Sequence, residues 1–408
     1  MSAEIRNYCL VTAAYWGFTL TDGALRMLVL LHFYSLGYSP FEIASLFLFY
    51  EFFGIVTNLV GGWVGVRVGL KVTLLTGLAL QVLALAGLSM FDPTWPTAIG
   101  VAYVMGAQAL SGIAKDLTKM SAKSAVKVLV PSNEQGALFK WVALLTGSKN
   151  ALKGLGFFMG GVLLSGLGFA GALQAMATGL GLVLLVSVFS LSGNMGQAKA
   201  NVKFTAIFSN NRNINYLSAA RFFLFGSRDI WFVVGLPLFL ATTLGWDHAE
   251  VGGYMAAWVI AYGCVQAGAP RLFRNSGAAP GAGISRLWIL MLVIVTAVIA
   301  LAVQVDVASK YSVTIGLGIF GFVFAINSAV HSYLVLAYTE TEQVSLNVGF
   351  YYMANAGGRL VGTILSGLSY QWGGLVMCLV LSALFLFAAW LLSLPLPKYG
   401  KNQNVQTN

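Results

Sequence analysis

Apolar stretches of about 20 residues recur along almost the whole chain, and they leave few possible folds. A helix that crosses a bilayer needs about this length, because lipid offers no partner for unpaired backbone N–H and C=O groups. Only 9% of the 408 residues are charged, whereas soluble domains have about 25%. We therefore predict an all-α membrane protein with twelve spans, at about 8–33, 40–65, 72–91, 95–116, 137–164, 171–191, 215–240, 250–270, 286–305, 311–337, 346–369 and 372–394.

Successive loops between the predicted spans lie on alternating sides of the membrane. The basic residues gather on one of these two sides. The side of the termini carries most of the Lys and Arg, whereas the opposite loops carry only Lys310. The positive-inside rule therefore places both termini in the cytoplasm. This asymmetry explains most of the net charge of +10 without a nucleic-acid partner. The lysine series at positions 115, 119, 123 and 127 is interpreted as a solvated cytoplasmic helix face.

The two halves of the sequence are weakly repeated. "LGYSPFEIA" at 36–44 reappears as "LGWDHAEVG" at 244–252, and Asp22 has a counterpart in Asp229. A polar, basic segment at 194–214 lies between the halves and is predicted to be a cytoplasmic linker. We predict six-helix bundles at 1–193 and 215–408, which is the plan of the major facilitator transporters, with a substrate site between the halves near the bilayer midplane.

A loop motif of that superfamily is partly present. Members usually carry G-x-L-A-D-R-x-G-R-K between the second and third spans, and this chain has "GWVGVRVGLK" at 62–71. Gly62, Arg67, Gly69 and Lys71 are kept. Val66 replaces the aspartate, so the salt bridge that this aspartate would make is not expected here.

Ionisable residues inside the predicted spans are the second strong constraint. Each costs about 2.5–3.5 kcal/mol at the bilayer centre, so such residues usually face a water-filled cavity or one another. None lies well inside the third, sixth, ninth or twelfth span, as expected if those four face lipid. The other spans contain six cations and three acids: Arg26, Lys149, Lys153, Arg221, Arg228 and Arg359, against Asp22, Glu51 and Asp229.

Pairing between neighbours cannot balance these charges. Asp22 and Arg26 are four residues apart on one helical face and can neutralise each other. Arg228 and Asp229 point about 100° apart on a helix, so we expect them to have different partners. Glu51 and Arg359 have none in their own spans, and we expect them to pair across the halves when the cavity is closed on one side. A surplus of three cations remains.

This surplus indicates an anionic substrate. Arginine binds an oxyanion with two parallel hydrogen bonds, and lysine adds a point charge. We therefore assign substrate binding to the six cations and to Asn355, which shares a helical face with Asn347, Tyr351 and Arg359. The three acids are predicted to be charge partners or proton carriers.

No catalytic motif, cofactor site or metal site is recognisable, so a transporter is favoured over an enzyme. The three histidines lie in separate regions, and the three cysteines are far apart. His331 is interpreted either as a polar core group or as a ligand or proton carrier.

Four stretches resemble the ArsJ branch of the major facilitator superfamily, which are organoarsenical efflux permeases: "FTLTDGALRML" at 18–28, "LSGIAKDLTKMSAKSAVK" at 110–127, "LFKWVALLTGSKNALKGLGFF" at 138–158 and "SAARFFLFGSRDIWFV" at 218–233. The resemblance implies export of 1-arseno-3-phosphoglycerate across the cytoplasmic membrane of a bacterium, and hence arsenate resistance. It also implies a functional partner, a glyceraldehyde-3-phosphate dehydrogenase that uses arsenate in place of phosphate. Two anionic ends on one substrate would match the surplus of cations.

Two alternatives remain open. A carrier or exchanger for another organic anion, such as a sugar phosphate, would need the same cationic cavity. A membrane-embedded enzyme or sensor without transport would not need the internal repeat.

Overall fold

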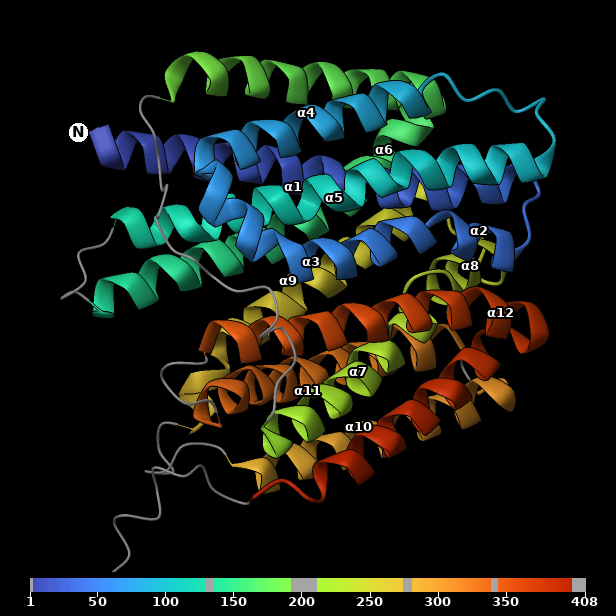
Figure 1. Cartoon of the computed structure of the whole chain (residues 1–408). Coiled ribbons are helices and arrows are strands. Elements are labelled where there is room, and N and C mark those ends of the chain that lie inside the picture. Colours follow the sequence, from blue (N-terminus) through green and yellow to red (C-terminus); the bar gives the residue numbers. More distant parts are fainter. Residues whose placement is uncertain are drawn as a thin grey trace, which may run out of the picture. The chain divides into compact units, whose positions relative to one another are not determined.

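A computed structural model describes residues 3–129, 135–191, 211–273, 281–307, 309–338 and 344–397 (Figure 1). Within these ranges the chain forms helices and short connections, with no strand. Eight helices in the described part are long and apolar enough to cross a membrane, judged by length and composition. The prediction of an all-α membrane protein is therefore confirmed.

The helices follow the predicted spans closely. The N-terminal half contains α1 (Ala3–Ser35), α2 (Pro40–Leu46), α3 (Leu48–Val68), α4 (Leu70–Leu88), α5 (Thr97–Leu129) and α6 (Gln135–Ser190). The C-terminal half contains α7 (Arg212–Phe232), α8 (Gly235–Thr242), α9 (His248–Phe273), α10 (Ala282–Gln304), α11 (Ser309–Ala337) and α12 (Val344–Ser393). Two predicted spans are each divided into a short and a long helix, α2 with α3 and α7 with α8.

Two very long helices each contain two predicted spans. α6 is interrupted at Gly168, whose φ of 67° lies in the left-handed region that favours glycine. α12 is interrupted at Gly373 and Gly374, and Gly374 has a φ of 60°. The first break lies between the predicted spans 137–164 and 171–191. The second lies just inside the predicted start at residue 372.

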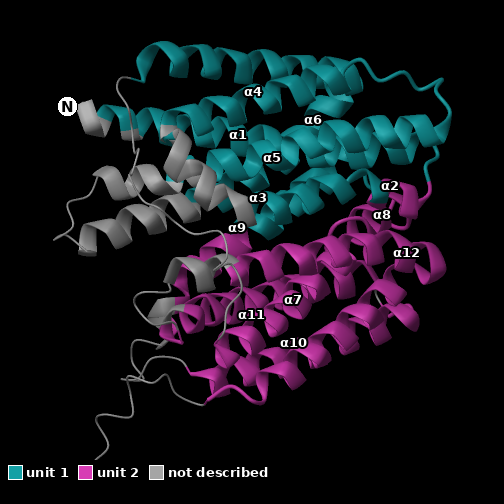
Figure 2. Cartoon of the chain, viewed as in Figure 1, with its two compact units in different colours: residues 1–38, 45–203, 246–260 teal, residues 39–44, 204–245, 261–408 magenta. Residues whose placement is uncertain are grey.

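The chain divides into two compact units, coloured separately in Figure 2. Unit 1 comprises residues 1–38, 45–203 and 246–260, and unit 2 comprises residues 39–44, 204–245 and 261–408. Each unit thus includes a short piece from the other half of the sequence. Of the predicted linker at 194–214, residues 194–210 lie outside the described part, and α7 begins at Arg212.

The sequence repeat corresponds to a repeated local structure. Before α2, the Ser39 N–H donates to the Glu42 carboxylate at 2.8 Å, and the Glu42 N–H donates to the Ser39 hydroxyl at 3.3 Å. Before α9, Asp247 and Glu250 exchange the same two bonds at 2.9 and 2.7 Å. Both are reciprocal N-terminal caps, which satisfy backbone donors that a helix start leaves free.

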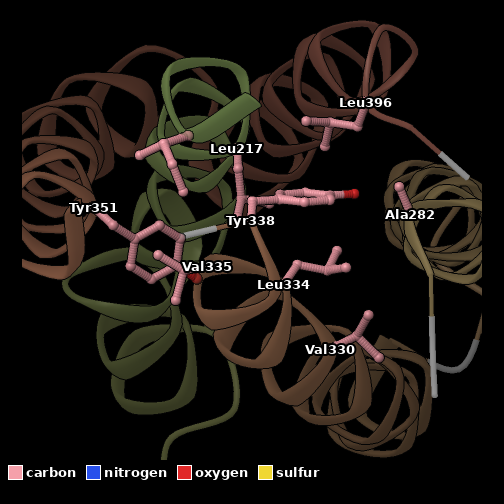
Figure 3. Packing of buried hydrophobic residues seen from close by; sticks show 9 residues of the cluster. Leu217, Ala282, Val330, Leu334, Val335, Tyr338, Tyr351 and Leu396 are labelled. Carbon is pink, nitrogen blue, oxygen red and sulfur yellow. The ribbon is translucent and has the colours of Figure 1, made fainter. Parts of the chain in front are cut away.

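An apolar cluster in unit 2 joins four helices (Figure 3). Its side chains are almost fully buried. The cluster consists of Ile214 and Leu217 on α7, Ala282 on α10, Val330, Leu334, Val335 and Tyr338 on or just after α11, Tyr351 on α12 and Leu396 after α12.

Glycine brings α1 and α6 into backbone contact within unit 1. A methyl group placed on Gly156 would lie 2.5 Å from the Leu20 carbonyl oxygen and 3.0 Å from the Gly23 Cα. One placed on Gly160 would lie 2.5 Å from the Ala24 carbonyl oxygen. The "GLGFF" and "MGG" stretches of α6 therefore have a packing role, since small residues let membrane helices approach closely.

We predict that Gly156→Ala lowers the free energy of unfolding by about 1–3 kcal/mol, because the added methyl forces the two helices apart. Gly179→Ala on the same helix is the matched control, since no atom lies within 4 Å of the added methyl there. Thermal unfolding of the purified proteins in detergent measures both. Equal melting temperatures for the two variants would contradict this account of the α1–α6 contact.

Candidate functional site

The two charges in the middle of α1 do not pair with each other, which corrects the prediction for Asp22 and Arg26. The Arg26 guanidinium (Nη2) binds the Glu51 carboxylate at 2.9 Å, and both side chains are buried. Asp22 instead accepts a 2.6 Å hydrogen bond from the Tyr50 hydroxyl. Tyr50 and Glu51 are consecutive at the start of α3, so one short segment of that helix reaches both charges.

Asp22 has a second partner on α6. The Lys153 ammonium lies 3.8 Å from the Asp22 carboxylate, and the lysine side chain is 20% exposed. The close glycine contact between α1 and α6 brings these residues together. Lys149 lies one turn earlier on α6 and is half-buried. Lys153 therefore has an acidic partner on a different helix. The sequence of its own span could not indicate this partner, because that span contains no acidic residue nearby.

α5 contributes a second charged centre to unit 1. Asp116 is fully buried, and its carboxylate binds the Lys119 ammonium at 2.7 Å and accepts from the Thr57 hydroxyl at 2.9 Å. Lys119 also donates to the Asn58 side chain at 2.9 Å. These contacts join α5 to α3.

Lys115 lies next to this centre, with its ammonium 4.0 Å above the centre of the Tyr50 ring. The interpretation of the lysine series as a solvated face is therefore wrong for Lys115 and Lys119, while the side chains at 123 and 127 lie outside the described part. Asp116 was missed as a site residue. The signal for it was a carboxylate inside an apolar helix with a lysine three residues later.

In unit 2, Asp229 receives two arginines. The Arg228 guanidinium folds back onto its neighbour, with Nε 2.7 Å from the Asp229 carboxylate, which corrects the prediction of separate partners. Arg359 on α12 donates from Nε to the other oxygen of Asp229 at 3.1 Å. Glu51 and Arg359 were expected to pair with each other because neither has a partner in its own span. Each binds a charge within its own unit.

The ion pairs of the two units occupy matching positions. Asp22 and Asp229 are 207 residues apart, and Lys153 and Arg359 are 206 residues apart. Both pairs depend on close helix contact: a methyl placed on Gly362 of α12 would lie 2.6 Å from the Gly226 carbonyl oxygen on α7. The internal repeat thus extends from the helix caps to a bridge between an aspartate and a cation.

Arg221 has no carboxylate partner among the described residues. Its guanidinium donates to the Asn355 side-chain oxygen at 3.0 Å and to the Ser328 hydroxyl at 3.2 Å. The guanidinium carbon lies 3.8 Å from the centre of the Phe225 ring. The side chain is only 4% exposed, so a full positive charge is held in the core of unit 2 by neutral groups.

Cations outnumber acids in the two units together. When Lys115, Asp116 and Lys119 of α5 are added to the nine charged residues predicted inside the spans, the set contains eight cations, Arg26, Lys115, Lys119, Lys149, Lys153, Arg221, Arg228 and Arg359, and four acids, Asp22, Glu51, Asp116 and Asp229. The surplus is four positive charges. The void that Asp22 and Arg26 line together with Tyr50 has no room for a water molecule, whereas typical ligand pockets have a volume of roughly 300–1,000 Å³. No group of side chains in the described part could hold a metal ion.

The comparisons with known proteins agree with this architecture. Residues 9–334 match the family described as Major Facilitator Superfamily. No curated protein has a sequence that matches this chain.

Three solved structures of membrane transporters have a similar fold. A D-xylose–proton symporter is 12% identical, with a TM-score of 0.72 over 97% of this chain and 98% of the other. A bacterial homologue of the iron transporter ferroportin in an outward-facing state is 14% identical, with a TM-score of 0.66 over 96% and 98%. A POT family transporter in complex with 5-aminolevulinic acid is 13% identical, with a TM-score of 0.72 over 94% of each chain. At these identities the likeness concerns the fold.

We predict that Glu51→Gln lowers the free energy of unfolding by about 3–5 kcal/mol, because it leaves the buried Arg26 charge without its carboxylate. Arg26→Gln should also destabilise. The double variant should cost less than the sum of the two by about 0.5–3 kcal/mol, which is the range for residues in direct contact. Thermal unfolding of the four proteins gives this coupling energy. Additive losses would remove the Arg26–Glu51 pair as a stabilising contact.

Proposed function

Because the chain belongs to the major facilitator superfamily, we propose that it is an efflux transporter for a small organic molecule with several negative charges. The observation that carries this proposal is the surplus of cations on its membrane helices. Uncompensated charge in a bilayer is costly, so such residues usually mark a substrate or ion path. A bound anion would supply the missing negative charge during each transport cycle.

The individual contacts suggest how the cations divide their roles. Asp229 holds both Arg228 and Arg359, so these two arginines together keep one positive charge in excess. Lys153 is partly exposed, and its ammonium lies 3.8 Å from the Asp22 carboxylate. Arg221 has neutral partners only among the described residues. We assign the substrate contacts to Arg26, Lys149, Lys153, Arg221, Arg228, Asn355 and Arg359.

The acids complete the site in this proposal. Asp22, Glu51 and Asp229 orient the cations beside them, and each could carry a proton when a substrate anion takes its place.

The proposed architecture consists of two six-helix bundles, 1–193 and 215–408, joined by a cytoplasmic linker at 194–214. Both termini are assigned to the cytoplasm by the distribution of Lys and Arg.

The substrate that we propose is 1-arseno-3-phosphoglycerate, exported across the inner membrane of a bacterium. Two observations support this substrate. Four stretches resemble ArsJ permeases, and the surplus of Lys and Arg side chains suits one arsenate and one phosphate group. A glyceraldehyde-3-phosphate dehydrogenase would form the substrate, and the result would be arsenate resistance. The alternative is a carrier or exchanger for another organic anion, such as a sugar phosphate, which the same cations would bind.

Everted membrane vesicles that contain the protein test this proposal. They are supplied with the dehydrogenase, arsenate, NAD and glyceraldehyde 3-phosphate, and uptake of the arsenical ester is measured. Uptake should depend on both the permease and arsenate. Uptake of a sugar phosphate without uptake of the arsenical ester would favour the alternative, and uptake of neither would reject the proposal.

We predict that Lys153→Gln or Lys149→Gln weakens substrate binding by about 2–5 kcal/mol if the lysine meets an oxyanion in a dry site. The same vesicles measure the loss of uptake at matched protein levels. Lys310→Gln is the control, because this lysine is exposed at the start of α11.

A double variant separates substrate contact from charge balance. If Lys153 only neutralises Asp22, then Asp22→Asn should restore uptake to the Lys153→Gln protein. We expect no restoration, because the lysine is assigned to the substrate. Recovery to the wild-type rate would remove Lys153 from the binding site.

A further inference from the structure

His331 is fully buried on α11, and neither ring nitrogen has a hydrogen-bond partner among the described residues. Buried polar side chains in native proteins are nearly always hydrogen-bonded, and each exception needs an explanation, such as an ion or ligand in another state. An imidazole offers two positions, since its neutral form has one N–H donor and one acceptor nitrogen. Both ring nitrogens of His331 lack a hydrogen bond to the described residues.

His331 shares its surroundings with Arg221. It lies one turn beyond Ser328 on α11, and Ser328 accepts a hydrogen bond from Arg221 through both its hydroxyl and its backbone carbonyl. The guanidinium is close enough to act electrostatically on the imidazole. The bonds that Arg221 makes with described residues use Nε and Nη1, and an arginine has five N–H donors in total. Donors on Nη2 are therefore available to a ligand.

Two independent observations thus meet at one place in unit 2. One is a buried guanidinium without a carboxylate partner in the described part of the chain, and the other is a buried imidazole without a hydrogen bond there. A negative ligand would satisfy both, because it supplies the counter-charge for Arg221 and oxygen atoms for His331. A chloride ion would supply the charge and accept the imidazole N–H, but it has no hydroxyl to donate to the acceptor nitrogen.

We propose that Arg221 and His331 form a subsite for one tetrahedral oxyanion group, phosphate or arsenate, of the transported molecule. The subsite rests on the proposed anion transport and adds His331 to it. Arg221 supplies the charge and a forked set of donors. The imidazole donates its N–H to a second oxygen, and its acceptor nitrogen matches the hydroxyl of a singly protonated phosphate or arsenate.

The apolar cluster of Figure 3 defines one border of this subsite. Leu217 lies four residues before Arg221 on α7, and Val335 lies four residues after His331 on α11. Tyr351 lies four residues before Asn355 on α12, and Asn355 holds Arg221. On each of the three helices the cluster therefore lies one turn from the polar residue, so the oxyanion would sit against a dry apolar layer.

Nuclear magnetic resonance of the ¹⁵N-histidine-labelled protein tests the subsite. The chain has three histidines, and the signals that disappear in His331→Asn belong to His331. If that variant does not fold, His32→Asn and His248→Asn identify His331 by elimination. Inorganic phosphate and arsenate are the probes, with chloride at equal ionic strength as the comparison.

We expect saturable shifts of the His331 ring nitrogens with phosphate and arsenate, and smaller shifts with chloride. Arg221→Gln should raise the phosphate concentration for half of the shift by roughly tenfold or more, as expected for loss of a hydrogen bond to a charged group. Arg212→Gln, an exposed arginine on the same helix, should leave it unchanged. Unchanged His331 signals, or equal responses to chloride, would overturn the subsite.

The outcome is separable from that of the proposed function. Phosphate-dependent shifts in a protein that fails to carry the arsenical ester would keep the subsite and reject that substrate. The opposite result is uptake of the ester by a protein whose His331 signals do not shift with phosphate or arsenate. That result would keep the transport proposal and reject the subsite.

Discussion

An aspartate on one membrane helix, bridged to a cation on another, is the interaction on which each unit depends. Asp22 with Lys153 joins α1 to α6, and Asp229 with Arg359 joins α7 to α12. Glycines at Gly156 and Gly362 allow the backbones to touch, so packing and electrostatics are inseparable here. The other buried charges are arranged around these bridges: Arg26 with Glu51, and Arg228 with Asp229.

Much of the fold could be predicted from the sequence because the bilayer imposes it. Span length, charge asymmetry and the repeat of 36–44 at 244–252 all reflect constraints that act on short segments. The helix caps illustrate this, since Ser39 with Glu42 and Asp247 with Glu250 are readable as local patterns. The breaks near Gly168 and Gly373 were likewise placed to within a few residues.

The ion pairs could not be predicted in the same way. Which acid meets which cation depends on the approach of different helices, and spacing along one helix is a poor guide to it. Asp22 and Arg26 share a face yet bind separate partners on α3. Asp116 was overlooked because its partner Lys119 belongs to a series that also fits a solvated surface. His331 could be named as a candidate, but its lack of hydrogen bonds is a property of the folded chain alone.

The glycine contact between α1 and α6 also has a mechanical consequence. Two helices whose backbones touch cannot slide along each other without a Cβ atom meeting a carbonyl oxygen, because residues with side chains flank the glycines on both helices. We therefore expect the two helices to move together when the unit rearranges. Such a movement would carry the backbones of Asp22 and Lys153 together.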